Sequence, residues 1–226
     1  GGSAVLTDVV PSKGLIAVSD VMTRIRKSNK LGLEPVDPSQ TSLVETVRVD
    51  AVKMNERLLE LAAQQSADIQ TRLNLEGVRT IHGTGRLDGT EHVIATTPDG
   101  KEERLHADII LVATGTRPRE LDDAKPDGER ILNWKQLYNL REMPRKLIVV
   151  GSGVTGAEFA SAYHALRCEV VLVSSREMVL PSQDADAARV IQEVFERRGM
   201  EILSRSRAVA ARRTEDGVIV TLADGR

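Results

Sequence analysis

The spacing of apolar residues predicts helices in the first third of the chain. Between Pro11 and Gly32, apolar residues recur mostly every three or four positions, and basic residues gather in the last turns. Gly32 ends this pattern, and a loop with two prolines covers 33–41. A long helix is then predicted over 42–75, with Gly77 as its stop.

After Gly77 the hydrophobic period changes to two, which predicts β-strands. Strands are expected over 78–86, 92–97 and 102–106, with turns at 88–89 and 98–100. Residues 107–113 are apolar apart from Asp108, which is typical of a strand buried on both faces. A polar linker over 122–129 and a short helix over 134–140 follow.

From Lys146 onward, strands and helices alternate. Strands are predicted over 147–150 and 169–174, and helices over 155–166 and 185–198. After Gly199 comes a strand pair that turns at 215–217. The pattern predicts an α/β fold with a parallel sheet. The region 77–100 is echoed weakly by 199–225, but the second copy stops where a buried strand should begin, so both ends of the chain look cut.

Composition narrows the class of protein. The 226 residues allow one large domain or two small ones, and 41% hydrophobic content is enough for a core. A net charge of -2 gives no electrostatic case for nucleic acid or an anionic membrane. No apolar run approaches the roughly 20 residues of a membrane span, and the first residues lack signal-peptide features. The single cysteine fits a cytoplasmic protein.

The sequence shows no spacing typical of a metal site, and one pair of acidic residues is considered for catalysis. Its four histidines share no ligand spacing; they are His82, His92, His106 and His164. Asp184 and Asp186 are expected to cap a helix rather than to act in catalysis.

A glycine-rich loop carries the clearest chemical signal. Gly151, Gly153 and Gly156 fit G-x-G-x-x-G between a predicted strand and helix. The first glycine permits a tight turn, the second lets a pyrophosphate approach the backbone, and the third allows close helix–strand packing. The expected cofactor contacts are Gly151, Ser152, Gly153, Val154, Thr155, Gly156, Ala157 and Glu158. The alternative is a tight turn that binds nothing.

The tip of the next strand bears on the choice between NAD and NADP. An NAD site favours a carboxylate there, but this chain has Ser174, Ser175 and Arg176. Two hydroxyls and a guanidinium suit a 2′-phosphate, so the pattern favours NADP, with use of both nucleotides as the alternative. Arg176 could also be a solvated charge, with Glu177 binding the ribose.

Four motifs in order resemble the flavoprotein disulfide reductases, the lipoamide dehydrogenase and glutathione reductase family. Residues 1–13, GGSAVLTDVVPSK, are similar to the family signature G-G-T-C-x4-C-x-P-S-K. The others are Gly83-Thr84-Gly85, Ala113-Thr114-Gly115 and the glycine-rich loop through Glu158, so the resemblance covers essentially the whole chain. It implies an FAD/NAD(P)-binding, Rossmann-like two-domain fold with parallel sheets and β-meanders, truncated at both ends. Residues 1–118 would be part of an FAD domain whose N-terminal dinucleotide motif is missing, 119–144 a linker, and 145–226 part of an NAD(P) domain.

The resemblance also implies roles for individual residues. Gly2 and Ser3 would lie along the FAD diphosphate and ribose, and Gly85 would contact FAD through its backbone. Lys13 would sit beside the isoalloxazine ring, paired with Glu158, and these two residues are the candidate catalytic pair. Thr114, Gly115 and Thr116 would pass under the flavin. Without the resemblance, Lys13 reads as an ordinary lysine near a helix start.

The main departure from the family lies at its two redox cysteines, which fall at Ala4 and Val9 here. Neither residue can form a thiolate, and Cys168 is expected to be a small core residue, so thiol–disulfide exchange is excluded. The expected activity is hydride transfer from NAD(P)H to FAD and on to a quinone-like small molecule. Residues 4–8, 126–132 and 151–158 also resemble the actinobacterial lipoamide-dehydrogenase-like NAD(P)H:quinone reductases, a group that lacks the first cysteine but keeps the second, where this chain has Val9. The alternatives are a soluble pyridine nucleotide transhydrogenase and a catalytically silent nucleotide-binding fragment; the full-length protein is expected to be a homodimer.

Overall fold

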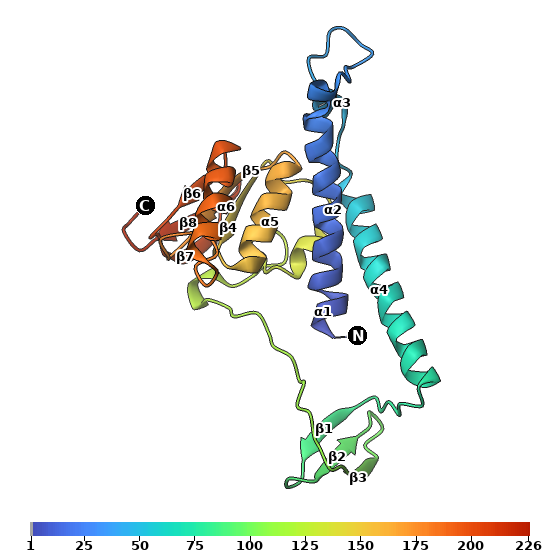
Figure 1. Cartoon of the computed structure of the whole chain (residues 1–226). Helices are drawn as coiled ribbons and strands as arrows, with labels where there is room; N and C mark the ends of the chain where they lie inside the picture. The colour runs from blue at the N-terminus through green and yellow to red at the C-terminus, as the bar shows by residue number, and fades with distance from the viewer. Residues whose placement is uncertain (1) are drawn as a thin grey trace.

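A three-stranded parallel sheet organises the C-terminal part of the chain. In the computed structural model, which describes residues 2–226, its strands pair in the order β4-β5-β6. They are β4 (Lys146–Val150), β5 (Glu169–Val173) and β6 (Glu201–Leu203). Helix α5 (Val154–Ala165) connects the first two strands and α6 (Ala185–Arg197) the next two (Figure 1). This Rossmann-like α/β arrangement confirms the predicted fold class.

Helix α5 is buried on two sides, which explains its composition. One side packs on the sheet and the other on α2 (Val9–Arg26), as Figure 1 shows. An amphipathic helix would bury its polar face in one of these two contacts. Helix α5 avoids this because it is rich in alanine and aromatic residues, which can pack on both sides. Ala160 and Tyr163 of α5 join Leu15 of α2 and Leu172 of β5 in one core cluster.

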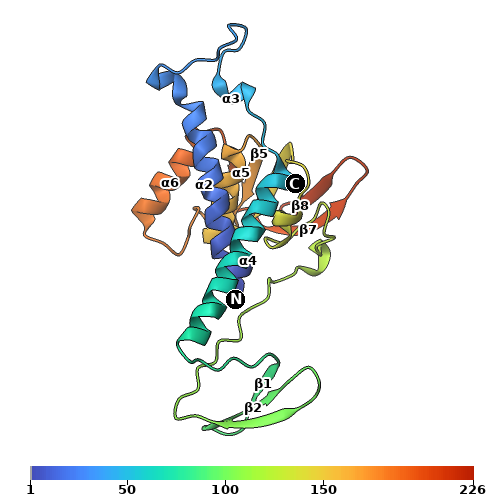
Figure 2. The same ribbon diagram turned by 90° about the vertical axis from the view of Figure 1, so that its right-hand side faces the viewer.

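Long helices occupy the N-terminal third of the chain. A short α1 (Ser3–Leu6) precedes α2, and a 3-10 turn (Ser28–Leu31) follows it. After a loop come α3 (Leu43–Thr46) and α4 (Ala51–Leu75), which packs against α2 (Figure 2). Gly14 lies at this crossing, where a Cβ atom would lie 2.4 Å from Cδ2 of the Leu58 side chain.

Two antiparallel units complete the chain. β1 (Thr84–Leu87), β2 (His92–Thr96) and β3 (Glu102–His106) form a meander in the order β1-β2-β3. It lies beyond the far end of α4, and residues 107–121 lead back from it to the rest of the molecule (Figure 1). β7 (Ala208–Arg213) and β8 (Val218–Leu222) form the predicted C-terminal hairpin. The linker adds 3-10 turns at Asp122–Ala124 and Gln136–Asn139.

Two strand predictions are wrong. Residues 107–113 form no strand, and the side chains of Ile109 and Leu111 are each 87% exposed. A strand needs a hydrogen-bonded neighbour, and beyond Ala107, whose N–H donates to the Glu91 carbonyl at 2.9 Å, no strand among the described residues pairs with this segment. The strand predicted over 78–86 begins only at Thr84, because 78–83 lacks a partner strand.

Three helix predictions also need correction. The helix predicted over 42–75 is broken at 47–50, where β-branched residues are extended and the Asp50 side chain accepts a hydrogen bond from the Lys53 amide, capping α4. The first helix ends at Arg26, and Gly32 instead ends the 3-10 turn with a φ of 74°. The helix predicted over 134–140 is a 3-10 turn. No helix among residues 2–226 combines the length and apolar character needed to cross a membrane.

Candidate functional site

The glycine-rich loop has the geometry that its sequence predicts. Gly151 ends β4 with a φ of 110°, a conformation that favours glycine. A Cβ atom on Gly156 would lie 1.9 Å from the carbonyl oxygen of Gly151, so only glycine lets α5 approach the loop this closely. A Cβ atom on Gly153 would meet no protein atom within 4 Å. The N-terminal amides of α5 therefore face open space that an anionic diphosphate can enter.

A hydrogen bond between two buried hydroxyl groups holds the glycine-rich loop against the end of β5. The Oγ atoms of Ser152 and Ser174 lie 2.7 Å apart, and Ser174 is completely buried. Ser174 Oγ also accepts a hydrogen bond from the Arg176 amide at 3.1 Å. The Ser174 hydroxyl, which was expected to face a 2′-phosphate, is thus turned inward toward Ser152 and the Arg176 backbone, and its contact with a ligand stays a prediction. Its position holds the ends of β4 and β5 together.

The remaining groups at the tip of β5 are open to solvent. Ser175 and Arg176 are exposed, whereas Glu177 pairs with Arg205, with 2.6 Å between Nη2 and Oε1. The main-chain N–H of Arg205 donates to the Arg176 carbonyl at 2.8 Å, so this loop lies beside the tip of β6. The tip of β5 therefore exposes Ser175 and Arg176 to solvent, next to Glu177, whose charge is partnered by Arg205.

Lys13 and Glu158 come together from opposite parts of the sequence. Lys13 lies in the first turns of α2 and Glu158 in the second turn of α5, and their side chains form an ion pair. The lysine side chain is 56% exposed and the glutamate side chain 27%, so one side of the pair is open. The two residues are 145 positions apart in sequence, and the packing of α2 against α5 brings them together.

Tyr138 is a residue of this site that the sequence did not single out. Its ring lies 6.0 Å from that of Phe159, centre to centre, beside the turn of α5 that carries Glu158. The hydroxyl is buried and has no hydrogen-bond partner among the described residues. Burial, together with the nearby Tyr163, Asp8 and Glu158, raises the pKa of Tyr138, which therefore stays protonated. A lone tyrosine in a linker gives no sequence signal for this position.

The structure places the positions of the missing redox cysteines near the same helix pair. Ala4 is on α1 and Val9 begins α2, and both side chains are exposed. Cys168 lies elsewhere, buried just before β5 as expected. Burial raises the pKa of the Cys168 thiol to about 12, so it remains a thiol near neutral pH.

We expect Cys168 to be unreactive in the folded protein. A thiol reagent such as DTNB reacts with a thiolate. Cys168 is buried and its pKa is raised, so the native protein forms very little thiolate and shields it from the reagent. At pH 8 the native protein should release almost no thionitrobenzoate, and the protein unfolded in guanidinium should release one equivalent. Rapid reaction of the native protein would show that this thiol is accessible.

The residues expected to contact FAD are brought together only in part. Gly2 and Ser3 lie at the start of α1, which packs on the helix that carries Lys13. Gly85 lies in the separate meander, and Thr114, Gly115 and Thr116 are exposed in the extended segment that follows it (Figure 1). The described residues therefore do not gather the expected flavin contacts into one site.

Two aspartates have a structural role, because their carboxylates accept hydrogen bonds from backbone amides. Asp184 caps α6, accepting hydrogen bonds at 3.0 Å from the amides of Asp186 and Ala187, as predicted. Asp127 in the linker accepts three backbone N–H groups, from Glu129, Arg130 and Ile131. Although burial opposes the charge, these hydrogen bonds lower the pKa of Asp127.

Fold and site together define a dinucleotide-binding α/β protein, and comparison with known proteins agrees. The model of the family described as pyridine nucleotide-disulphide oxidoreductase matches residues 1–226. The chain therefore belongs to the pyridine nucleotide-disulphide oxidoreductase family.

Individual relatives cover the whole of this chain. An NAD(P)H dehydrogenase (quinone) of Mycobacterium tuberculosis is 46% identical over 100% of this chain and 46% of its own length. A dihydrolipoyl dehydrogenase of Zymomonas mobilis is 30% identical over 100% of this chain and 47% of its own. The crystal structure of LpdA from M. tuberculosis matches with a TM-score of 0.87 and 45% identity, over 100% of this chain and 48% of that one. The chain thus spans about half the length of the relatives it matches.

Proposed function

We propose that this chain is the nucleotide-binding part of an oxidoreductase that takes hydride from NAD(P)H onto FAD and passes electrons to a quinone-like acceptor without a redox disulfide. One observation carries the proposal. Helix α5 presents its N-terminal amides to the space above Gly153 and, one turn later, joins Glu158 to Lys13. The same helix therefore supports a diphosphate site and an ion pair suited to the flavin side.

The residues at the loop fit a dinucleotide. The open space at Gly153 accommodates a diphosphate against the α5 amides, whose partial positive charge favours an anion. Ser152 and Ser174 fix the loop by a bond that no ligand has to displace. Ser175 and Arg176 are the exposed groups for the ribose end, and Arg176 supplies the charge that a 2′-phosphate requires.

The proposal places the flavin side at the ion pair, because Gly2 and Ser3 are the expected FAD contacts that the structure puts on the helices beside it. When bound, FAD accepts a hydride and releases its electrons to a second substrate. Lys13 would hold a positive charge beside the ring, which favours its reduced, anionic form, and Glu158 would keep the lysine in place. Tyr138 and Phe159 pack beside Glu158 and restrict the movement of its helix turn.

The residues at the family's cysteine positions favour a direct electron acceptor. Ala4 and Val9 exclude a covalent relay through sulfur, and Cys168 is buried in the other part of the chain. The described residues would therefore offer no sulfur relay between the flavin side and a small diffusible acceptor. A quinone-like acceptor agrees with the name of the 46% identical relative, NAD(P)H dehydrogenase (quinone).

An anaerobic visible spectrum tests the proposal. The purified protein would be mixed with FAD, and the flavin bands recorded before and after addition of NADPH or NADH. We expect bleaching by the nucleotide and recovery on addition of a benzoquinone. Comparable reduction by both nucleotides would favour transhydrogenation between their pools. Flavin that binds but is not reduced by either nucleotide would contradict the proposal.

Arg176 should determine the preference for NADPH. Replacing it by alanine removes the exposed cation at the tip of β5, so 2′,5′-ADP should bind about tenfold more weakly, roughly 1.4 kcal/mol. Binding of 5′-ADP, which lacks the 2′-phosphate, should change less than twofold. Isothermal titration calorimetry measures both, and an equal loss for the two ligands would mean that Arg176 does not read the 2′-phosphate.

A further inference from the structure

The antiparallel meander places two histidines from consecutive strands opposite each other. His92 begins β2 and His106 ends β3, and the register places them directly opposite each other. The neighbouring Ala107 N–H donates to the Glu91 carbonyl at 2.9 Å, so the pair at 91 and 107 is hydrogen-bonded. His92 and His106 therefore occupy the alternate, non-hydrogen-bonded position, where facing side chains are closest.

The separation of the two rings matches that of two imidazoles on one metal ion. Their centres are 5.2 Å apart and their planes are inclined by 70°. A zinc–nitrogen bond of about 2.05 Å puts the ion about 3.2 Å from each ring centre, so two tetrahedral ligands have centres about 5.2 Å apart. His106 is exposed and His92 half-buried, and rotation of each ring about its terminal side-chain bond is broad and of low cost.

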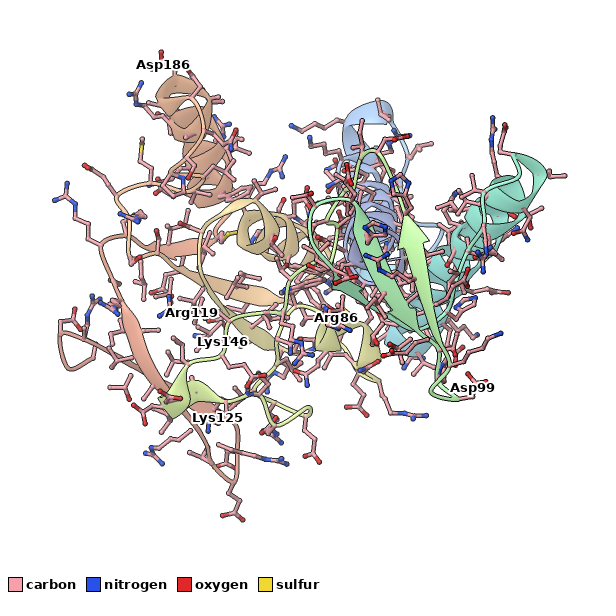
Figure 3. All side chains as sticks on the ribbon, turned by 90° about the horizontal axis from the view of Figure 1, so that it is seen from below. Arg86, Asp99, Arg119, Lys125, Lys146 and Asp186 are labelled. Atoms are coloured by element: carbon pink, nitrogen blue, oxygen red, sulfur yellow. The ribbon has the colours of Figure 1, made fainter. Side chains whose placement is uncertain are left out.

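One of the cations beside the pair has its charge offset. Arg104, two residues before His106, donates from Nε to Oδ2 of Asp88 at 2.7 Å, whereas Arg86 lies across β2 from Arg104 and also acts on Asp88. Asp88 is also fixed beside the pair by its main-chain N–H, which donates to the His92 carbonyl at 2.9 Å. Figure 3 shows this sheet from below, with Arg86 labelled on it.

We propose that His92 and His106 form a binding site for one divalent transition metal ion that prefers imidazole, such as Zn²⁺ or Cu²⁺. No third histidine, cysteine or carboxylate among residues 2–226 joins them, so water completes the coordination. The ion would link the start of β2 to the end of β3, at the end of this strand pair away from its turn. The inference does not depend on the proposed oxidoreductase activity.

Calorimetric titration of the untagged protein with Zn²⁺ tests the site. We expect one ion per chain, and at least tenfold weaker binding for both His92→Ala and His106→Ala. His106→Phe keeps a ring against its neighbour without a ligand nitrogen and should lose binding equally, which separates ligation from packing. His82→Ala and His164→Ala remove histidines outside the pair and should leave the affinity within twofold.

Electron paramagnetic resonance of the Cu²⁺-loaded protein gives a second readout. The spectrum should show coupling to two imidazole nitrogens in the wild type and to one in each single variant. Binding that survives His92→Ala and His106→Phe unchanged, or binding that is absent from the wild type at millimolar Zn²⁺, would overturn the proposal.

Discussion

Replacing Gly156 by alanine is expected to abolish nucleotide binding and to destabilise the fold. The new methyl group would lie 1.9 Å from the carbonyl oxygen of Gly151, and a backbone atom cannot move aside as a flexible side chain can. Relief of the clash must push α5 away from β4, which we expect to cost about 3 kcal/mol of unfolding free energy. The affinity for NADPH should fall by about 100-fold or more, measured by calorimetry alongside denaturant unfolding.

Gly153→Ala is the matched control for that result. A methyl group at this position meets no protein atom within 4 Å, so stability should change by less than about 1 kcal/mol. The same methyl group projects into the space proposed for the diphosphate, so affinity for NADPH should still fall by about tenfold. If Gly153→Ala binds NADPH as the wild type does, the diphosphate does not lie against this loop.

Replacing Lys13 by methionine is expected to slow flavin reduction with little effect on stability. The Lys13–Glu158 pair is half-exposed on the lysine side, and such pairs contribute about 0–1 kcal/mol to folding. The proposed role is different, because the positive charge would stabilise negative charge that develops on the flavin. The rate of anaerobic flavin bleaching by NADPH should fall at least tenfold, and the binding of 2′,5′-ADP should stay within twofold.

Glu158→Gln separates the charge of Lys13 from its position. The amide can still accept a hydrogen bond from the lysine, so we expect a smaller loss of rate than in Lys13→Met. A double variant should lose little more than Lys13→Met alone, because the two residues act as one unit. Losses that multiply independently, or a fall in unfolding free energy as large as the fall in activation free energy, would assign the pair a purely structural role.

The fold of residues 145–226 could be predicted from sequence because its signals are local. The strand before Gly151, the glycines themselves and the alanine-rich helix after them specify a strand–turn–helix unit within 20 residues. Asp184 likewise caps the helix that immediately follows it. In each case the deciding contacts join residues that are close in the chain.

Two expectations that the structure does not meet depended on distant partners, whereas the corrected helix ends depend on local caps. Residues 107–113 have the composition of a buried strand, but a strand forms only where another strand pairs with it, and no strand among the described residues pairs with 108–113. Ser174 stands where a ribose ligand was expected, yet its hydroxyl is turned inward by Ser152, 22 residues away. The facing of His92 and His106 follows from sheet register, which sequence spacing does not reveal.

The ion pair at the proposed site shows what resemblance adds to the residues. From residue spacing alone, Lys13 is an ordinary lysine near the start of a helix. The resemblance to the family predicted that it pairs with Glu158, and the structure contains that ion pair. The consequence for flavin chemistry remains a proposal. Tyr138 was missed by both routes, because neither its spacing nor the family motifs mark it.

A crystal structure of the protein with NADPH bound would test the central claim most directly. The claim is that one helix, α5, serves both the dinucleotide diphosphate and the Lys13–Glu158 pair. We predict the diphosphate on the amides that follow Gly153, the 2′-phosphate beside Ser175 and Arg176, and the nicotinamide directed toward Glu158. A nucleotide bound away from the N-terminus of α5, or bound there with its nicotinamide directed away from Glu158, would contradict it.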